Sequence, residues 1–145
     1  MCIIIDANVA GKFCSNPISK EANLIYQKLT KGELHLALGG KLTKELSKTG
    51  MRRILIELNR RGATKIYPTN EINAETKKLQ NLNICASNDH HVIALARISR
   101  ARVLFSLDHN LHKDFRDRNF INRPRGSVYS STNHANLLTN PPNCA

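Results

Sequence analysis

The sequence contains no tryptophan, and aromatic residues make up only 5% of its 145 residues. Single-stranded nucleic acids often bind by stacking their bases on aromatic side chains, so this scarcity argues against a stacking platform. No apolar run is long enough to span a bilayer, and the N-terminus lacks the basic start and long apolar core of a signal peptide. We therefore expect a cytoplasmic protein with no membrane segment.

Cysteine is scarce, and its positions are scattered. The chain has Cys2, Cys14, Cys85 and Cys144, and no two of them form a C-x-x-C pair. This spacing matches neither a zinc finger nor the dense disulfide pattern of a small secreted domain. We expect four reduced thiols, two or three of them buried.

Acidic residues are few compared with basic ones. The chain has 22 Lys and Arg against 11 Asp and Glu, which gives a formal net charge of +11. Small basic domains often bind polyanions, because contacts with phosphate release condensed counterions. A solvated basic surface or an acidic protein partner would also explain the composition, so charge alone favours nucleic acid only slightly.

Apolar segments of strand and helix character alternate along the chain, and its length suits one domain. The apolar residues of the first strand are continuous, which is typical of a strand buried on both faces. The alternation predicts βαβ crossovers, and therefore an α/β fold whose mostly parallel sheet lies between two helical layers. Strands are expected at residues 2–6, 33–40, 64–68, 101–108 and 126–131, and helices at residues 17–30, 41–48, 51–62, 70–82, 88–99 and 109–117.

The domain is expected to cover residues 1–130. Residues 131–145 are rich in Asn and Pro. We expect at most one helical turn in this tail, followed by frayed chain.

Four acidic residues occupy corresponding positions in these elements. Asp6 and Asp108 each end a buried strand, Asp89 begins a helix, and Glu45 lies on the helix after the second strand. In a parallel sheet the carboxyl ends of the strands and the N-termini of the following helices lie at one edge. We therefore expect Asp6, Asp89 and Asp108 to converge there, with Glu45 within reach.

A group of carboxylates predicts a metal site. Neighbouring carboxylates repel one another, and a divalent cation relieves the repulsion. Mg²⁺ and Mn²⁺ prefer oxygen ligands, and such cations activate water and stabilise leaving oxygens in phosphoryl chemistry.

Each acid also has an ordinary structural interpretation. Asp89 is typical of a helix N-cap, Asp6 and Asp108 could cap the elements that follow them, and Glu45 could pair with Lys41 or Lys48. Two fully buried strands that both end in aspartate are harder to explain in this way. The joint pattern favours a functional use of the charges.

The segments "IIIDANV", "TKEL" and "NDHHVIALARISRARVLFSLDHNLHKDF" resemble PIN-domain ribonucleases, most of all the VapC-like toxin branch. The resemblance covers about residues 1–120. It implies a three-layer fold with sheet order 3-2-1-4-5. It also implies Mg²⁺- or Mn²⁺-dependent hydrolysis of RNA phosphodiester bonds, which leaves a 5′-phosphate and a 3′-hydroxyl.

The same resemblance assigns roles to individual residues. It implies that Asp6, Glu45, Asp89 and Asp108 are the catalytic acids, with the three aspartates as metal ligands and Asn8 and Ser106 in support. Many relatives have a further aspartate where this chain has Asn110, so the binding of a second metal is left open. Glu45 is the better candidate to accept the proton of the attacking water, because a helix residue is more mobile than a strand end. A homodimer formed through residues 17–61 and a cognate antitoxin are the implied protein partners.

Basic residues form three groups in the sequence. We expect the first group to contact RNA, because it flanks Glu45: Lys41, Lys44, Lys48, Arg52 and Arg53. The other two groups are Arg97, Arg100 and Arg102, and Arg116, Arg118, Arg123 and Arg125.

The histidines near the acids are His90, His91, His109 and His112. A zinc site would need a further ligand set that the spacing does not provide. Surface exposure is the simplest expectation for these side chains, ahead of a role beside the acids or toward phosphate.

A second class of function also fits the sequence: a non-catalytic RNA- or partner-binding domain on a degenerate PIN fold. The presence of all four acids favours the enzyme. A DNA-directed flap nuclease would need long helical insertions that 145 residues do not hold. A phosphotransfer receiver would need an acidic pair after the first strand.

Overall fold

The central strand is β1 (Cys2–Ile5), and all four of its residues are fully buried. In the computed structural model, which describes residues 2–139 and 142–145, this strand lies in a sheet of order β3-β2-β1-β4-β5. The other strands are β2 (His35–Leu38), β3 (Thr64–Ile66), β4 (Val103–Phe105) and β5 (Ser127–Tyr129). Every pairing is parallel, and Ile3 of β1 lies opposite Leu36 and Val103. The predicted α/β fold and strand order are confirmed.

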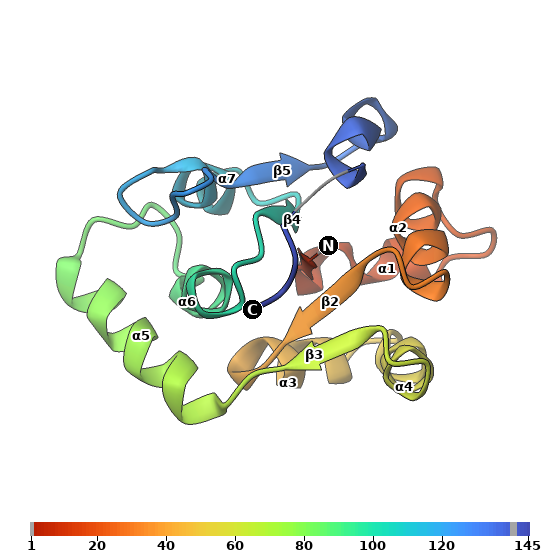
Figure 1. The fold of residues 1–145 in the computed structure, drawn as a ribbon, viewed down its shortest axis with the longest axis horizontal. Helices are drawn as coiled ribbons and strands as arrows, with labels where there is room; N and C mark the ends of the chain where they lie inside the picture. Colours follow the sequence, from red (N-terminus) through yellow and green to blue (C-terminus); the bar gives the residue numbers. More distant parts are fainter. Residues whose placement is uncertain (1, 140–141) are drawn as a thin grey trace.

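Helices cover both faces of the sheet, which gives three layers (Figure 1). One layer contains α5 (Thr69–Leu82), α6 (His90–Ser99) and α7 (His109–Arg116), and the other contains α1 (Ala10–Cys14), α2 (Lys20–Thr30) and α4 (Arg52–Arg60). Between β2 and α4, α3 (Gly40–Ser47) contacts both α5 and α6. Short 3-10 helices are formed by η1 (Ala7–Val9) and η2 (Thr132–Leu138). In the described part of the chain, no helix is both long enough and apolar enough to cross a membrane.

The central helix α6 is apolar nearly all round, and it is buried accordingly. Residues 91–96 and Ser99 are all buried, and the helix packs on β1, β2 and α5. Any polar side chain in this run must therefore find a partner inside the protein. This constraint matters for His91.

The segment between β1 and α2 differs from the sequence prediction. Residues 7–14 form η1 and α1, where no helix was predicted. Only Ala10 and Phe13 of α1 are buried. Five residues are too few to display a helical period, so the sequence carries no signal for this helix.

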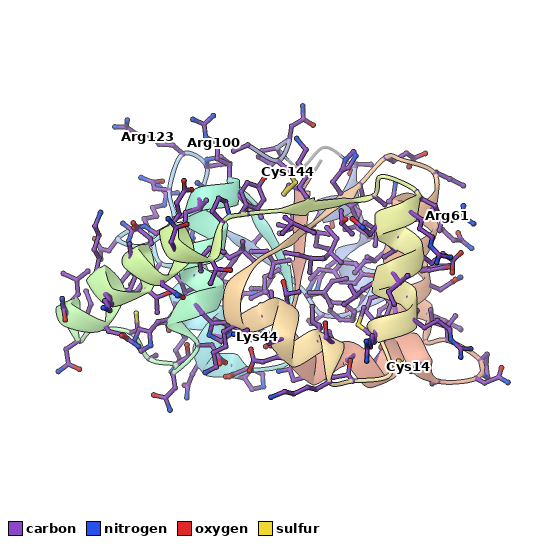
Figure 2. All side chains as sticks on the ribbon, turned by 90° about the horizontal axis from the view of Figure 1, so that it is seen from below. Cys14, Lys44, Arg61, Arg100, Arg123 and Cys144 are labelled. Atoms are coloured by element: carbon purple, nitrogen blue, oxygen red, sulfur yellow. A yellow bond between two sulfur atoms is a disulfide. The ribbon has the colours of Figure 1, made fainter. Side chains whose placement is uncertain are left out.

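The ends of the chain are joined, which contradicts two predictions. Cys2 and Cys144 form a disulfide with a Cα–Cα distance of 4.9 Å, while Cys14 is exposed and Cys85 half-buried (Figure 2). The backbone amide of Ala145 donates to the carbonyl of Ser99 (2.8 Å), and the Tyr67 hydroxyl donates to the carbonyl of Ala145 (2.7 Å). The expectation of four reduced thiols is wrong, and residues 142–145 are held rather than frayed. Residues 140–141 of the predicted tail lie outside the described residues.

We expect reduction of this disulfide to destabilise the protein. The bond closes a loop of 142 residues, and loss of such a constraint typically costs about 2–4 kcal/mol of unfolding free energy. Urea unfolding with and without dithiothreitol should show this loss in wild type and in Cys85→Ser. Cys144→Ser should already be destabilised and should not respond to the reductant. If the wild-type protein in dithiothreitol has four titratable thiols but unfolds at the same urea concentration as the untreated protein, the prediction is wrong.

Candidate active site

Asp6 directly follows the central strand and is only 7% exposed. Its backbone amide continues the β1–β4 pairing by donating to the carbonyl of Phe105 (2.9 Å). Oδ2 of its carboxylate accepts a hydrogen bond from the Ser106 hydroxyl (2.8 Å). The end of β4 therefore holds the carboxylate that ends β1.

The buried Ser106 hydroxyl connects three groups at this edge of the sheet. Besides donating to Asp6, its Oγ accepts from Nδ2 of Asn8 (3.3 Å) and from the backbone amide of Asp108 (3.1 Å). Oδ1 of Asn8 accepts in turn from the backbone amide of Leu107 (3.3 Å). Asn8 and Ser106, which the resemblance assigned to support, both lie next to Asp6 in the structure.

Asp89 lies at the N-cap position of α6, but its side chain makes no capping hydrogen bond. Its backbone amide donates instead to Oγ of Ser87 (3.2 Å). Its negative charge is close enough to Asp6 to raise the pKa of that carboxyl. The Asp89 side chain therefore does not cap α6, contrary to its ordinary structural interpretation.

The pKa of Asp6 is raised above its usual value, with burial as the largest cause. The Ser106 hydrogen bond and the backbone N–H of Ala7 oppose the shift, whereas the charges of Asp89 and Glu45 add to it. We call Asp6, Glu45 and Asp89 the acidic cluster. Within the cluster, the charged form of Asp6 is therefore disfavoured.

Glu45 is paired with a histidine rather than with a lysine. Nε2 of His91 lies 2.6 Å from Oε1 of Glu45, and the His91 side chain is 7% exposed against 35% for Glu45. Among the described residues, neither Lys41 nor Lys48 forms an ion pair with Glu45. The ordinary alternative for Glu45, a pair with Lys41 or Lys48, is therefore not the arrangement in the structure.

The expectation of surface exposure is wrong for two of the histidines. His91 is buried because it lies on the all-apolar helix α6, and His112 is buried because it lies on the inner face of α7. Nε2 of His112 donates to the carbonyl of Ser106 (2.6 Å), which orients the turn after β4. His109 is exposed and contacts His112 edge to face, and His90 is half-buried.

Asp108 takes the structural role that was weighed for it, as the cap of the following helix. Its Oδ1 accepts from the backbone amides of Asn110 (2.9 Å) and Leu111 (3.2 Å) at the start of α7. Its charge is not among those that raise the pKa of Asp6. Asn110 is exposed on the first turn of α7. The structure thus brings Asp6, Glu45 and Asp89 within electrostatic reach, and links Asp108 to them through Ser106.

Asp114 contributes to this region although the sequence analysis did not select it. It is 3% exposed, and its two carboxylate oxygens accept from the backbone amides of Ala86 (2.8 Å) and Ser87 (2.9 Å). It therefore anchors the loop that carries Asp89. Its position three residues after Leu111, on the buried face of α7, is the only signal that the sequence contained.

The donor chemistry of these residues suits a hard divalent cation. The acidic cluster offers carboxylate oxygens, and a cation would relieve the repulsion from Asp89 and Glu45 that adds to the effect of burial on the pKa of Asp6. Within residues 2–139 and 142–145, however, no three His, Cys, Asp or Glu side chains lie close enough together to hold a metal ion. A cation would therefore have to draw these carboxylates closer together.

The predicted RNA-binding residues are exposed around the same helix. Lys41, Lys44 and Lys48 belong to α3 or follow it directly, and Arg52 and Arg53 begin α4. Figure 2 shows Lys44 toward the side of the molecule opposite Cys144. Lys41 and Lys44 therefore lie on the helix that also carries Glu45, and the other three basic residues follow it in the chain.

Comparisons with known proteins do not assign the chain to a family: no family model, no curated protein and no solved structure matches it. Membership of the PIN-domain family thus stays a prediction from the sequence motifs.

We expect Asp6→Asn to stabilise the protein at pH 7 by about 1 kcal/mol, because it removes a charge that the folded state disfavours. Because the pKa of Asp6 is higher in the folded state than in the unfolded chain, the ionised carboxylate of wild type lowers the unfolding free energy at every pH above the folded pKa. It should shrink as the pH falls toward the ordinary aspartate range. Urea unfolding of both proteins across this pH range measures the difference. A variant less stable than wild type at pH 7 would contradict the prediction.

The same substitution at Asp114 should have the opposite sign and serves as the matched control. Asparagine keeps the size of the side chain but replaces one acceptor oxygen with an amide group, which cannot accept from Ser87. We expect Asp114→Asn to lower the unfolding free energy by about 2 kcal/mol. Urea unfolding at pH 7 tests this, and an unchanged midpoint would show that the loop before α6 does not depend on Asp114.

Proposed function

We propose that the protein is a divalent-metal-dependent endoribonuclease that hydrolyses RNA phosphodiester bonds, as the toxin of a toxin–antitoxin or defence system. The main support is the acidic cluster at the carboxyl end of β1, where burial raises the pKa of Asp6 and the charges of Asp89 and Glu45 add to the shift. Catalytic sites are where such unfavourable charge is commonly retained. The parallel sheet of order 3-2-1-4-5 agrees with the fold implied by the PIN-domain resemblance.

In this proposal Asp6 and Asp89 hold Mg²⁺ or Mn²⁺, with Asp108 completing the site. When bound, the cation lowers the pKa of a water and offsets the negative charge of the phosphate. Ser106 and Asn8 keep the Asp6 carboxylate oriented toward the site.

Glu45 is the candidate proton acceptor. Its carboxylate is partly exposed, whereas that of Asp6 is buried, so a water can approach Glu45 more easily. The 2.6 Å contact with His91 fixes the position of one carboxylate oxygen and leaves the other free to receive a proton.

RNA is proposed to bind over α3 and the start of α4. Lys41, Lys44, Lys48, Arg52 and Arg53 are exposed there and would contact the phosphate backbone. Binding through such contacts should weaken steeply with salt and carry little base preference.

The proposal includes a homodimer through residues 17–61 and an antitoxin partner. On α4, a hollow of about 660 Å³ is lined by three arginines (Arg52, Arg53 and Arg60), by one acid (Glu57) and by Ile56, which is 48% exposed. A basic surface with an exposed apolar residue suits an acidic, partly apolar protein segment. A cytoplasmic location belongs to the same proposal, although the Cys2–Cys144 disulfide is uncommon for that compartment.

A non-catalytic RNA-binding domain is the second candidate. The capping role of Asp108 favours it, because one of its carboxylate oxygens is already used by the first turn of α7. The position of Asn110, where relatives of the predicted family often have aspartate, points the same way.

Cleavage of total RNA by purified protein in Mn²⁺, Mg²⁺ or EDTA distinguishes the two candidates. We expect discrete fragments with metal, none with EDTA, and at least ~100-fold slower cleavage by Asp6→Asn and Asp89→Asn. Glu33→Gln, an exposed glutamate before β2, is the matched control and should cleave like wild type.

Since Asp6→Asn is expected to fold at least as stably as wild type, its loss of cleavage would not reflect unfolding. Equal cleavage by all variants would indicate a contaminating nuclease. Absence of cleavage with RNA binding retained would favour the non-catalytic domain.

A further inference from the structure

Arg102, just before β4, is buried without an acidic partner. The residue is 9% exposed. Its Nη1 donates to the carbonyls of Ala96 (2.9 Å) and Ala101 (3.0 Å), and its Nη2 donates to that of Asn122 (3.4 Å). All three acceptors are neutral, and Nε is buried with no hydrogen-bond partner among residues 2–139 and 142–145.

This arrangement leaves a positive charge uncompensated. Removing a guanidinium from water is costly unless an opposite charge and full hydrogen bonding replace the water. Burial lowers the pKa of Arg102, and the charge of Arg100 lowers it further. In the part of the chain that the structure describes, no carboxylate forms an ion pair with Arg102.

A hollow of about 260 Å³ is lined in part by Arg102. Arg102, Arg125, Ser127 and Asn136 contribute to its wall, and none of the described residues that line it is acidic. Arg125 also lines two adjoining hollows, which contain Lys113, Arg116 and Arg118 but only one acid, Asp117. Cationic and hydrogen-bonding side chains therefore converge on a concave surface.

Capping of α6 explains only part of this arrangement. The bond from Arg102 to Ala96 satisfies a carbonyl in the last turn of α6, where a cation is favourable. Capping accounts neither for the unpartnered Nε nor for the second arginine on the same hollow. An anion in the hollow would compensate both charges.

We propose that the hollow between Arg102 and Arg125 binds a phosphate-type anion. Phosphate supplies several acceptor oxygens and two negative charges, which suit two guanidinium groups. The ligand is inorganic phosphate or the 5′-terminal phosphate of an oligonucleotide, since both present the same group.

The site is separate from the acidic cluster. Arg102 and Ser127 lie at the start of β4 and β5, whereas Asp6 lies at the end of β1. Figure 2 shows Arg100 and Arg123 on the same side of the molecule as Cys144 and away from Lys44. Anion binding here does not depend on the proposed cleavage reaction.

Isothermal titration of the full chain with inorganic phosphate, at constant ionic strength in chloride, tests the proposal. Arg125 is exposed, so Arg125→Gln should keep the fold while raising the phosphate dissociation constant at least about tenfold. Arg123→Gln removes a charge that is also exposed on the same loop but does not line the hollow, and should bind as wild type does. No phosphate binding by wild type, or equal binding by Arg125→Gln, would overturn the proposal.

A second titration identifies the source of the phosphate. A trinucleotide with a 5′-phosphate is compared with the same trinucleotide bearing a 5′-hydroxyl, in EDTA so that no cleavage occurs. Tighter binding of the phosphorylated form that is lost in Arg125→Gln assigns the site to a nucleic-acid end. Equal binding of both forms, with inorganic phosphate still bound through Arg125, assigns it to free phosphate.

Discussion

The hydrogen bond from the Ser106 hydroxyl to the Asp6 carboxylate joins the ends of β1 and β4, and the candidate site is organised around it. Without it a nearly buried carboxylate would have lost its water and gained little in return. The same hydroxyl accepts from Asn8 and from the backbone amide of Asp108, so it also positions the start of α7. β1 and β4 are neighbouring parallel strands, and their last residues, Ile5 and Phe105, lie opposite each other. The residues that follow them, Asp6 and Ser106, are therefore close enough to form this hydrogen bond.

The buried aspartates Asp6 and Asp114 differ in the hydrogen bonds that their carboxylates accept. Asp114 receives two backbone N–H groups, which compensate its buried charge and fix the loop before α6. The pKa of Asp6 is raised, chiefly because the carboxyl is buried and also because Asp89 and Glu45 are nearby. Asp114 therefore contributes rigidity, while Asp6 retains unfavourable charge that a cation could relieve.

The excess of basic residues does not form a single surface. One set is exposed on α3 and α4 near Glu45, and another lines hollows around Arg125 near the start of β5. The disulfide and the bonds of Ala145 hold the end of the chain near the start of the sheet. The acidic cluster lies at the carboxyl ends of the strands, whereas Arg102 and Ser127 lie where β4 and β5 begin, so the acidic and arginine-rich regions are at opposite ends of the strands.

The sequence by itself determined the α/β fold with its largely parallel sheet, because strands that alternate with helices have few ways to bury both faces, whereas the strand order followed from the resemblance to PIN domains. It also indicated which acids end strands or begin helices, and Asn8 and Ser106 as their neighbours. Only the tertiary structure decided the Glu45–His91 pair, the capping role of Asp108, the anchoring by Asp114 and the Cys2–Cys144 bond. Which residues pair in these contacts depends on the direction of each side chain and on how segments distant in the sequence come together. Hydrophobic periodicity carries no information about either.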